Sequence, residues 1–164
     1  TKTALVQLLE VANYKIFDIN LRAPHYTEDT LIEFMNVADF IKFNDEELYE
    51  VSRFLGSKYN SLEQNIEFIS NQTKTNAICV TLGAHGAVLF LDGTYYHSCG
   101  YYAEVVDTVG SGDSFLATLI YNLFANKDPQ KAMDTACAVG ALVAQSEGAN
   151  PIISDEEILK FISA

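Results

Sequence analysis

Apolar residues recur along this chain at two different spacings, which predict helices in some segments and strands in others. Where they recur every three or four residues, as along one face of a helix, we expect helices: over residues 1–12, 112–125 and 129–145, and after the capping residues Thr27, Asn44, Ser61 and Ser154. Short apolar or alternating runs predict strands over residues 15–20, 39–43 and 77–82, and a hairpin over residues 87–97. This order of elements is typical of a three-layer α/β domain.

Local signals support the predicted boundaries. Asn44 with Glu47 has the spacing of a capping box, in which each side chain bonds the backbone N–H of the other residue. Asp92-Gly93, between the two strands of the hairpin, favours a type I′ turn. The run over residues 77–82 is nearly all apolar, as a strand covered on both faces of a parallel sheet would be. We therefore expect a single α/β domain over residues 1–164.

Composition limits the kinds of partner. The chain has 164 residues, of which 49% are hydrophobic, so it is long enough for one substantial core. The formal net charge is -12 and no Lys/Arg cluster is present, which argues against nucleic acid or an anionic membrane as a partner. No apolar run approaches the roughly 20 residues of a spanning helix, and no signal segment opens the sequence. A cytoplasmic protein is expected.

Cys79, Cys99 and Cys137 are widely spaced and form no C-x-x-C pair. This spacing suggests neither a disulfide framework nor a zinc site. We expect all three to be reduced and mostly buried.

The segment from Asp107 to Ala117 carries the strongest candidate chemistry. Gly110 and Gly112 flank a serine directly before a predicted helix, so the backbone can turn sharply and direct free N–H groups at one point. Such a point suits an anion. Asp113 would repel a phosphate there unless it has its own role, and we expect it to accept a proton from a hydroxyl that attacks a bound phosphoryl group.

Two other interpretations of this glycine turn lack necessary parts. The dinucleotide fingerprint G-x-G-x-x-G fails because Phe115 stands at the third glycine position. A hydrolase with Ser114 as nucleophile would need a histidine base after it, but all three histidines precede Ser114. The anion site with its own base needs no missing residue.

Polar residues also follow the first two predicted strands. Asp18, Asn20 and Arg22 alternate, so an extended chain would project all three on one side of a strand end where α/β sheets bind ligands. A polar exit from the strand with a local ion pair explains them equally well. Asn44 and Glu47 need only a capping role, although acidic residues at a strand end could also hold Mg²⁺ through water. The two roles can coexist.

A second glycine turn follows the run over residues 77–82. Gly83 and Gly86 would let a ligand approach the backbone closely, but a tight turn is the commoner reason for such a pair. His85 lies in this turn, and ligand contact is the less favoured of its two interpretations.

The segment Asp107-Thr108-Val109-Gly110-Ser111-Gly112-Asp113-Ser114-Phe115-Leu116-Ala117 resembles the signature D-T-x-G-A-G-D-x-F-x-A of the ribokinase-like, or PfkB-type, carbohydrate kinases. Other matches to this family occur in its order along the chain. They are Asp18-x-Asn20-x-Arg22, which resembles a strand end of the fructokinase-like branch, Asn44-x-x-Glu47, Thr81-Leu82-Gly83-x-x-Gly86 and Gly148-Ala149.

The resemblance implies a three-layer α/β/α ribokinase-like fold and ATP-dependent phosphorylation of a sugar hydroxyl. It implies that Asp113 is the base and that the amides of Gly110, Ser111, Gly112 and Asp113 stabilise the transferring group. The nucleotide would be contacted by Asn44, Glu47, Thr81, Gly83, Gly86 and Gly148, and the sugar by Asp18, Asn20 and Arg22. Glu47 would hold Mg²⁺ through water, and Asp107 with the carbonyl of Val109 would hold a monovalent cation such as K⁺.

Members of the family are substantially longer, and nothing resembling their N-terminal strands, sugar-binding glycines or β lid precedes Thr1. We therefore expect this chain to be the nucleotide-binding and catalytic half, binding sugar weakly or not at all by itself. If the polypeptide begins at Thr1, the first strands of the sheet are absent, and the exposed edge would favour association of copies. The alternative function is a noncatalytic nucleotide-binding or assembly module derived from such a kinase.

Overall fold

The computed structural model describes residues 2–163. The chain divides into two compact units, one made of Thr1–Val80 and Phe90–Gly93 and the other of Thr81–Leu89 and Thr94–Ala164. Five strands form one sheet and follow one another across it in chain order, from β1 to β5. Within the described residues, no helix is both long and apolar enough to cross a bilayer.

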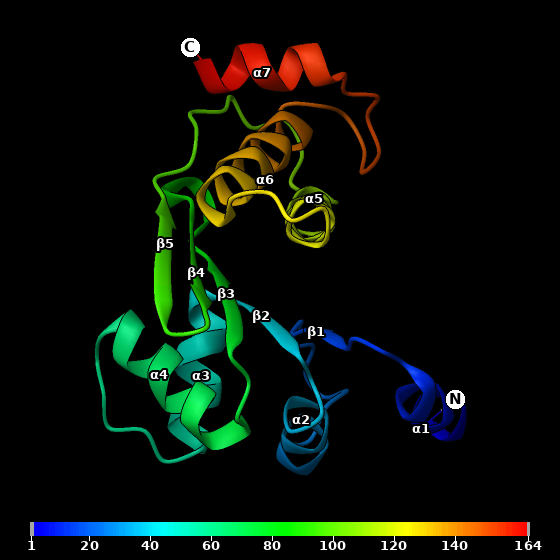
Figure 1. Ribbon diagram of the computed structural model, residues 1–164, viewed down its shortest axis with the longest axis vertical. Coiled ribbons are helices and arrows are strands. Elements are labelled where there is room, and N and C mark those ends of the chain that lie inside the picture. Colours follow the sequence, from blue (N-terminus) through cyan, green and yellow to red (C-terminus); the bar gives the residue numbers. More distant parts are fainter. Residues whose placement is uncertain (1, 164) are drawn as a thin grey trace. The chain divides into compact units, whose positions relative to one another are not determined.

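The first unit is built on a parallel pair of strands. It contains α1 (Lys2–Val11), β1 (Ile16–Asp18), α2 (Glu28–Met35), β2 (Phe40–Asn44), α3 (Asp45–Phe54), α4 (Leu62–Thr73) and most of β3 (Ala77–Thr81). β1 and β2 lie side by side (Figure 1), with Asp18 opposite Lys42. Phe40, Ile41 and Phe43 of β2 are 0% exposed, as expected for a strand that is covered on both faces.

Side-chain caps start α2, α3 and α4 where the sequence predicts. Thr27 accepts from the backbone N–H of Thr30, and Ser61 accepts from that of Gln64. Asn44 and Glu47 form both bonds of a capping box at α3. These caps satisfy N–H groups that have no partner within their own helix.

The second unit contains η1 (Gly83–His85), most of β4 (Ala87–Leu91), β5 (Thr94–Ser98), α5 (Ser111–Phe124), α6 (Pro129–Ala144) and α7 (Asp155–Ser163). The turn between β4 and β5 has positive φ at Asp92 and Gly93, which confirms the predicted type I′ turn. α5 and α6 pack closely because Gly140 leaves room for Ser111, whose Oγ donates to the Gly140 carbonyl at 2.9 Å.

Burial differs from the expected pattern at several positions. In α5, Phe115 and Leu119 are buried, but Leu116, Ile120 and Leu123 are only half-buried because each follows a buried residue by one position and so lies at one side of the buried face. Cys79 and Cys137 are buried and Cys99 is exposed, and none of the three forms a disulfide among the described residues. Burial raises the pKa of the Cys137 thiol, which keeps it protonated.

Candidate functional site

In the first unit, an ion pair joins the carboxyl ends of β1 and β2. Lys42 Nζ lies 2.8 Å from Asp18 Oδ1, and the two side chains are 9% and 27% exposed. The pair follows from the strand register, because Asp18 and Lys42 are direct neighbours across the ladder. Lys42 was not expected to take part in a site. Its signal is a single cation inside the otherwise apolar run Phe40-Ile41-Lys42-Phe43.

The Glu47 carboxylate binds two backbone segments at this strand end. Glu47 Oε2 accepts from the backbone N–H of Asn44 at 2.8 Å, and Oε1 accepts from that of Leu21 at 3.2 Å. Asn44 Oδ1 in turn accepts from the Glu47 N–H at 2.8 Å. Glu47 is only 7% exposed, so its side chain is fixed by its surroundings.

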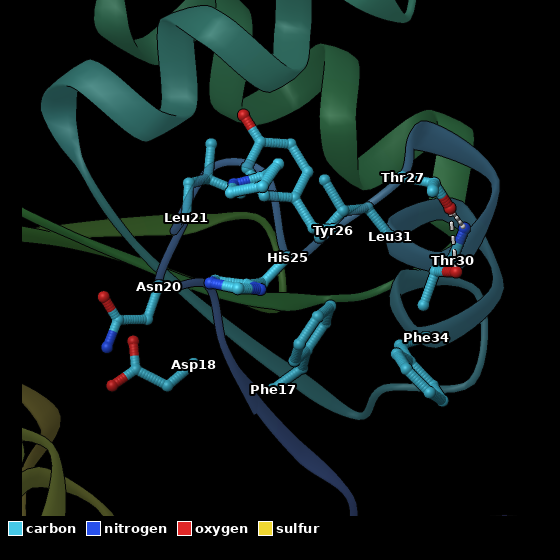
Figure 2. Close-up of a pocket in the computed structure, with 11 residues that line it drawn as sticks. Phe17, Asp18, Asn20, Leu21, His25, Tyr26, Thr27, Thr30, Leu31 and Phe34 are labelled. Carbon is cyan, nitrogen blue, oxygen red and sulfur yellow. Dashed lines mark hydrogen bonds between the residues drawn. The ribbon is translucent and has the colours of Figure 1, made fainter. Parts of the chain in front are cut away.

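Asp18 and Asn20 line an open pocket of about 390 Å³ between the end of β1 and α2. Figure 2 shows their polar groups at one end of this pocket and the rings of Phe17 and Phe34, whose centroids are 5.7 Å apart, at the other. Arg22 is exposed and is not among the residues that line it. A pocket with an apolar wall and a polar end can hold a small molecule with both kinds of surface.

His25 and Tyr26 also line this pocket, but the sequence did not suggest a site for either. The Tyr26 hydroxyl donates to Glu50 Oε1 at 2.7 Å. This bond raises the pKa of Tyr26, so the hydroxyl remains a proton donor at neutral pH.

In the second unit, the start of α5 presents free backbone donors. Gly110, with φ of 80°, is the N-cap, and the Ser111 N–H bonds the Thr108 carbonyl at 3.2 Å. Among the described residues, the N–H groups of Gly112 and Asp113 have no hydrogen-bond partner, and both residues are exposed. The helix dipole and these N–H groups favour an anion at this point.

Three further segments pack around this helix start. A Cβ on Gly110 would lie 2.6 Å from the Ala149 carbonyl oxygen, so the turn at Gly148, with φ of 79°, contacts the glycine turn directly. The N–H groups of Val106 and Asp107 both bond the Ala144 carbonyl at the end of α6. The structure therefore places the Gly148-Ala149 turn against Gly110 and ties the Val106-Asp107 segment to the end of α6.

Asp107 Oδ1 accepts from the backbone N–H of Val109 at 3.0 Å. No group of three metal-binding His, Cys, Asp or Glu side chains converges anywhere in residues 2–163. Cation sites built from one carboxylate with backbone carbonyls, or with waters and phosphate oxygens, do not need such a group. The oxygen donors of Asp107 and of Glu47 fit these two kinds of site.

In the glycine turn after β3, the backbone packs closely against Gly86, whereas the space beside Gly83 is open. A Cβ on Gly86 would overlap the backbone of Ser98 to Gly100, so this glycine is required by the fold. Nothing lies within 4 Å of the position of a Cβ on Gly83, and His85 is exposed. Thr81, at the end of β3, is half-buried.

Comparison with known families matches residues 2–156 to the pfkB family of carbohydrate kinases. A fructokinase of Klebsiella pneumoniae is 31% identical over 160 residues, which are 91% of this chain and 50% of that protein. An ATP-dependent ribose-1-phosphate kinase of Halopiger xanaduensis is 30% identical over 132 residues, covering 80% of this chain and 41% of that protein.

Solved structures are also similar to this chain. A 2-dehydro-3-deoxygluconokinase of Thermotoga maritima superposes with a TM-score of 0.84 and 28% identity over 99% of this chain and 55% of its own. A fructokinase of Vibrio cholerae, solved with fructose, ADP and a potassium ion, has a TM-score of 0.81 and 26% identity over 98% of this chain and 54% of its own. The chain spans about half the length of these relatives.

Proposed function

Since the chain belongs to the pfkB family of carbohydrate kinases, we propose that it supplies the nucleotide-binding and catalytic part of an ATP-dependent sugar kinase. One observation carries this proposal: the exposed Asp113 carboxylate lies in the first turn of α5, next to the unpartnered N–H groups of Gly112 and Asp113. A base and an anion site side by side are what transfer of a phosphoryl group to a hydroxyl requires.

In the proposed reaction, the oxygen of a sugar hydroxyl forms a bond to the γ-phosphorus of ATP. The bond between that phosphorus and the β–γ bridging oxygen breaks, and ADP leaves with the electron pair. The hydroxyl proton passes to the Asp113 carboxylate. The backbone from Gly110 to Asp113 stabilises the charge on the transferring group, and a preorganised donor of this kind contributes roughly 3 kcal/mol to a transition state.

We assign the remaining residues as the family resemblance implies. Asp18, Asn20 and Arg22 contact the sugar, while Asn44, Glu47, Thr81, Gly83, Gly86 and Gly148 contact the nucleotide. Mg²⁺, when bound, neutralises part of the phosphate charge, and Glu47 would hold it through water. Asp107 and the Val109 carbonyl would hold K⁺, the cation in the structure of the Vibrio cholerae fructokinase.

The test is release of ADP with a panel of ketoses, aldoses and nucleosides, measured on the longest product of the gene that carries this sequence and on this chain. Asp113→Asn removes the proton acceptor, so kcat should fall about 10²- to 10⁴-fold while the Kd for ATP changes little. Asp155→Asn makes the same substitution in the first turn of α7 and should leave kcat unchanged. A near-normal kcat for Asp113→Asn would show that Asp113 is not the base.

A second candidate function is a noncatalytic nucleotide-binding or assembly module, because the free N–H groups at the start of α5 suit a nucleotide phosphate whether or not phosphoryl transfer follows. This candidate predicts that the protein binds ATP but releases no ADP with any sugar of the panel. Sedimentation of the same samples would show whether copies of the protein associate.

A further inference from the structure

Glu47 contacts a segment that its capping role does not require. In a capping box the glutamate bonds the backbone of its own helix start, and Glu47 Oε2 does this with Asn44. The other oxygen, Oε1, accepts from the N–H of Leu21, which lies 26 residues earlier in the chain. Glu157 in the box at α7 bonds Ser154 alone among the described residues. The contact with Leu21 is therefore an additional feature of Glu47.

Leu21 makes this contact just beyond the last backbone hydrogen bond between β1 and β2. β1 ends at Asp18, and its last bond to β2 runs from the Ile19 N–H to the Lys42 carbonyl at 2.8 Å. Ile19 is 1% exposed, so this position is firmly packed. Two residues further on, the Glu47 carboxylate accepts the N–H that a neighbouring strand would otherwise accept.

The segment that carries the proposed sugar contacts is thus held at three successive points. Lys42 holds the Asp18 carboxylate, β2 holds the Ile19 N–H, and Glu47 holds the Leu21 N–H. Asn20 lies between the two held amides and is itself exposed, as is Arg22 directly after them. The backbone at Asn20 cannot shift without breaking one of these bonds.

We propose that Glu47 is a positioning residue for the sugar, which fixes the Asp18 to Arg22 segment through the Leu21 N–H. The proposal rests on the proposed function, in which this segment binds the acceptor. It gives Glu47 a role separate from that of a metal ligand: loss of the carboxylate contact would loosen the sugar subsite even where Mg²⁺ still binds. Each oxygen accepts one N–H and keeps a second lone pair, so both roles are compatible.

Two substitutions separate the roles. Glu47→Gln keeps the shape but turns an amide NH₂ toward one of the two N–H groups. Glu47→Asp keeps the negative charge and a carboxylate for a hydrated metal ion, but it is one methylene too short to reach both backbone segments. Glu46→Gln is the matched control, because it makes the same charge change in the same first turn of α3 at an exposed side chain.

The first measurement is amide hydrogen exchange at Leu21, followed by NMR. Glu47→Gln and Glu47→Asp should speed exchange at Leu21 about tenfold, as expected from loss of a hydrogen bond to a charged group, and Glu46→Gln should not. Thermal unfolding of each variant shows that the fold is intact. Unchanged exchange at Leu21 in both Glu47 variants would overturn the proposal, whatever the kinase assay gives.

The second measurement is the kinetics of the longest gene product. Both Glu47 variants should raise KM for the sugar about tenfold. Glu47→Asp, which keeps the carboxylate, should leave the half-saturating Mg²⁺ concentration within about twofold, whereas Glu47→Gln, which loses the charge, should also raise it. A raised Mg²⁺ requirement with an unchanged sugar KM would assign Glu47 to the metal alone and overturn the proposal. If the wild-type protein phosphorylates no sugar, the proposed function fails, and the claim that Glu47 positions a sugar fails with it. Faster Leu21 exchange would then show only that the backbone contact exists.

Discussion

The two groups of candidate site residues are held in place by opposite means. In the first unit, side chains do the holding: Lys42 pairs with Asp18, and Glu47 joins the backbone of Asn44 to that of Leu21. In the second unit, the backbone does it: Gly110 takes a left-handed conformation against Ala149, and two N–H groups bond one carbonyl at the end of α6. The first group depends on charged side chains, and the second depends on the absence of a side chain at Gly110.

This difference matches the chemistry proposed for each group. A sugar offers hydroxyls at fixed angles, which directional side chains held by ion pairs and hydrogen bonds can match. A transferring phosphoryl group spreads charge over several oxygens, which converging backbone N–H groups stabilise without a side chain that must reorganise. Substitutions that add atoms should therefore harm the second group most, and substitutions that remove charge should harm the first.

The largest effect is expected for Gly110→Ala. A Cβ there would lie 2.6 Å from the Ala149 carbonyl oxygen and 2.8 Å from its Cα, at a φ of 80°. The strained backbone and the overlap together should lower the free energy of unfolding by about 3 kcal/mol, and kcat should fall because the α5 start moves. Urea denaturation measures the first and ADP release the second.

Gly56→Ala is the matched control for this substitution. Gly56 has a φ of 91°, but nothing lies within 4 Å of the position of its Cβ. Gly56→Ala should therefore lower the free energy of unfolding only by the cost of the strained backbone, about 1 kcal/mol. Equal losses at Gly56 and Gly110 would show that contact with Ala149 does not shape the anion site.

A smaller effect is expected for Lys42→Met, which keeps the length of the side chain but removes its charge. Asp18 would be left without its cation at a position only 27% exposed. Breaking a fully buried pair costs about 3–5 kcal/mol, and water reaches Asp18, so we expect a loss of about 2 kcal/mol in the free energy of unfolding.

A double-mutant cycle checks this expectation. Adding Asp18→Asn to Lys42→Met removes the unpaired charge and should recover part of the loss, because the two residues are in direct contact. A double variant no more stable than Lys42→Met would show that the ion pair does not stabilise the strand ends.

The sequence predicts the elements and their caps because both depend on residues close together in the chain. The Asn44–Glu47 box, the Asp92-Gly93 turn and the Ser61 cap of α4 are each read within four residues and are all present. The glycine turn at Gly110 is also local, and its left-handed conformation follows from its residue type.

The contacts that hold the site are not local, and the sequence could not predict them. Lys42 meets Asp18 across 24 residues, Glu47 meets Leu21 across 26, and Ser111 meets Gly140 across 29. Each depends on strand register or helix packing, which a single sequence does not determine. Ser111 illustrates the consequence: its hydroxyl, next to the expected anion, instead donates to α6.

The smallest effect is expected where a capping box is exposed. Glu157 accepts from both the N–H and the hydroxyl of Ser154, at 2.8 and 2.7 Å, and these bonds lower its pKa from the ordinary value of 4.5. A carboxylate with a lowered pKa stabilises the folded state above its unfolded-state pKa and loses that contribution as the pH falls through the folded value. The start of α7 should therefore loosen only below about pH 4.5.

An NMR titration of the Glu157 carboxyl measures this directly. The wild-type pKa should lie below 4.5, and Ser154→Ala should return it toward that value with little change in stability at pH 7, because the box is solvent-exposed. A wild-type pKa at or above 4.5 would contradict the bonds to Ser154. Glu47 occupies the same box position but is 7% exposed and also holds Leu21. If replacing Glu47 lowers the free energy of unfolding markedly and breaking the Ser154–Glu157 box hardly lowers it, the difference is due to burial and the Leu21 contact. The capping geometry is common to both boxes.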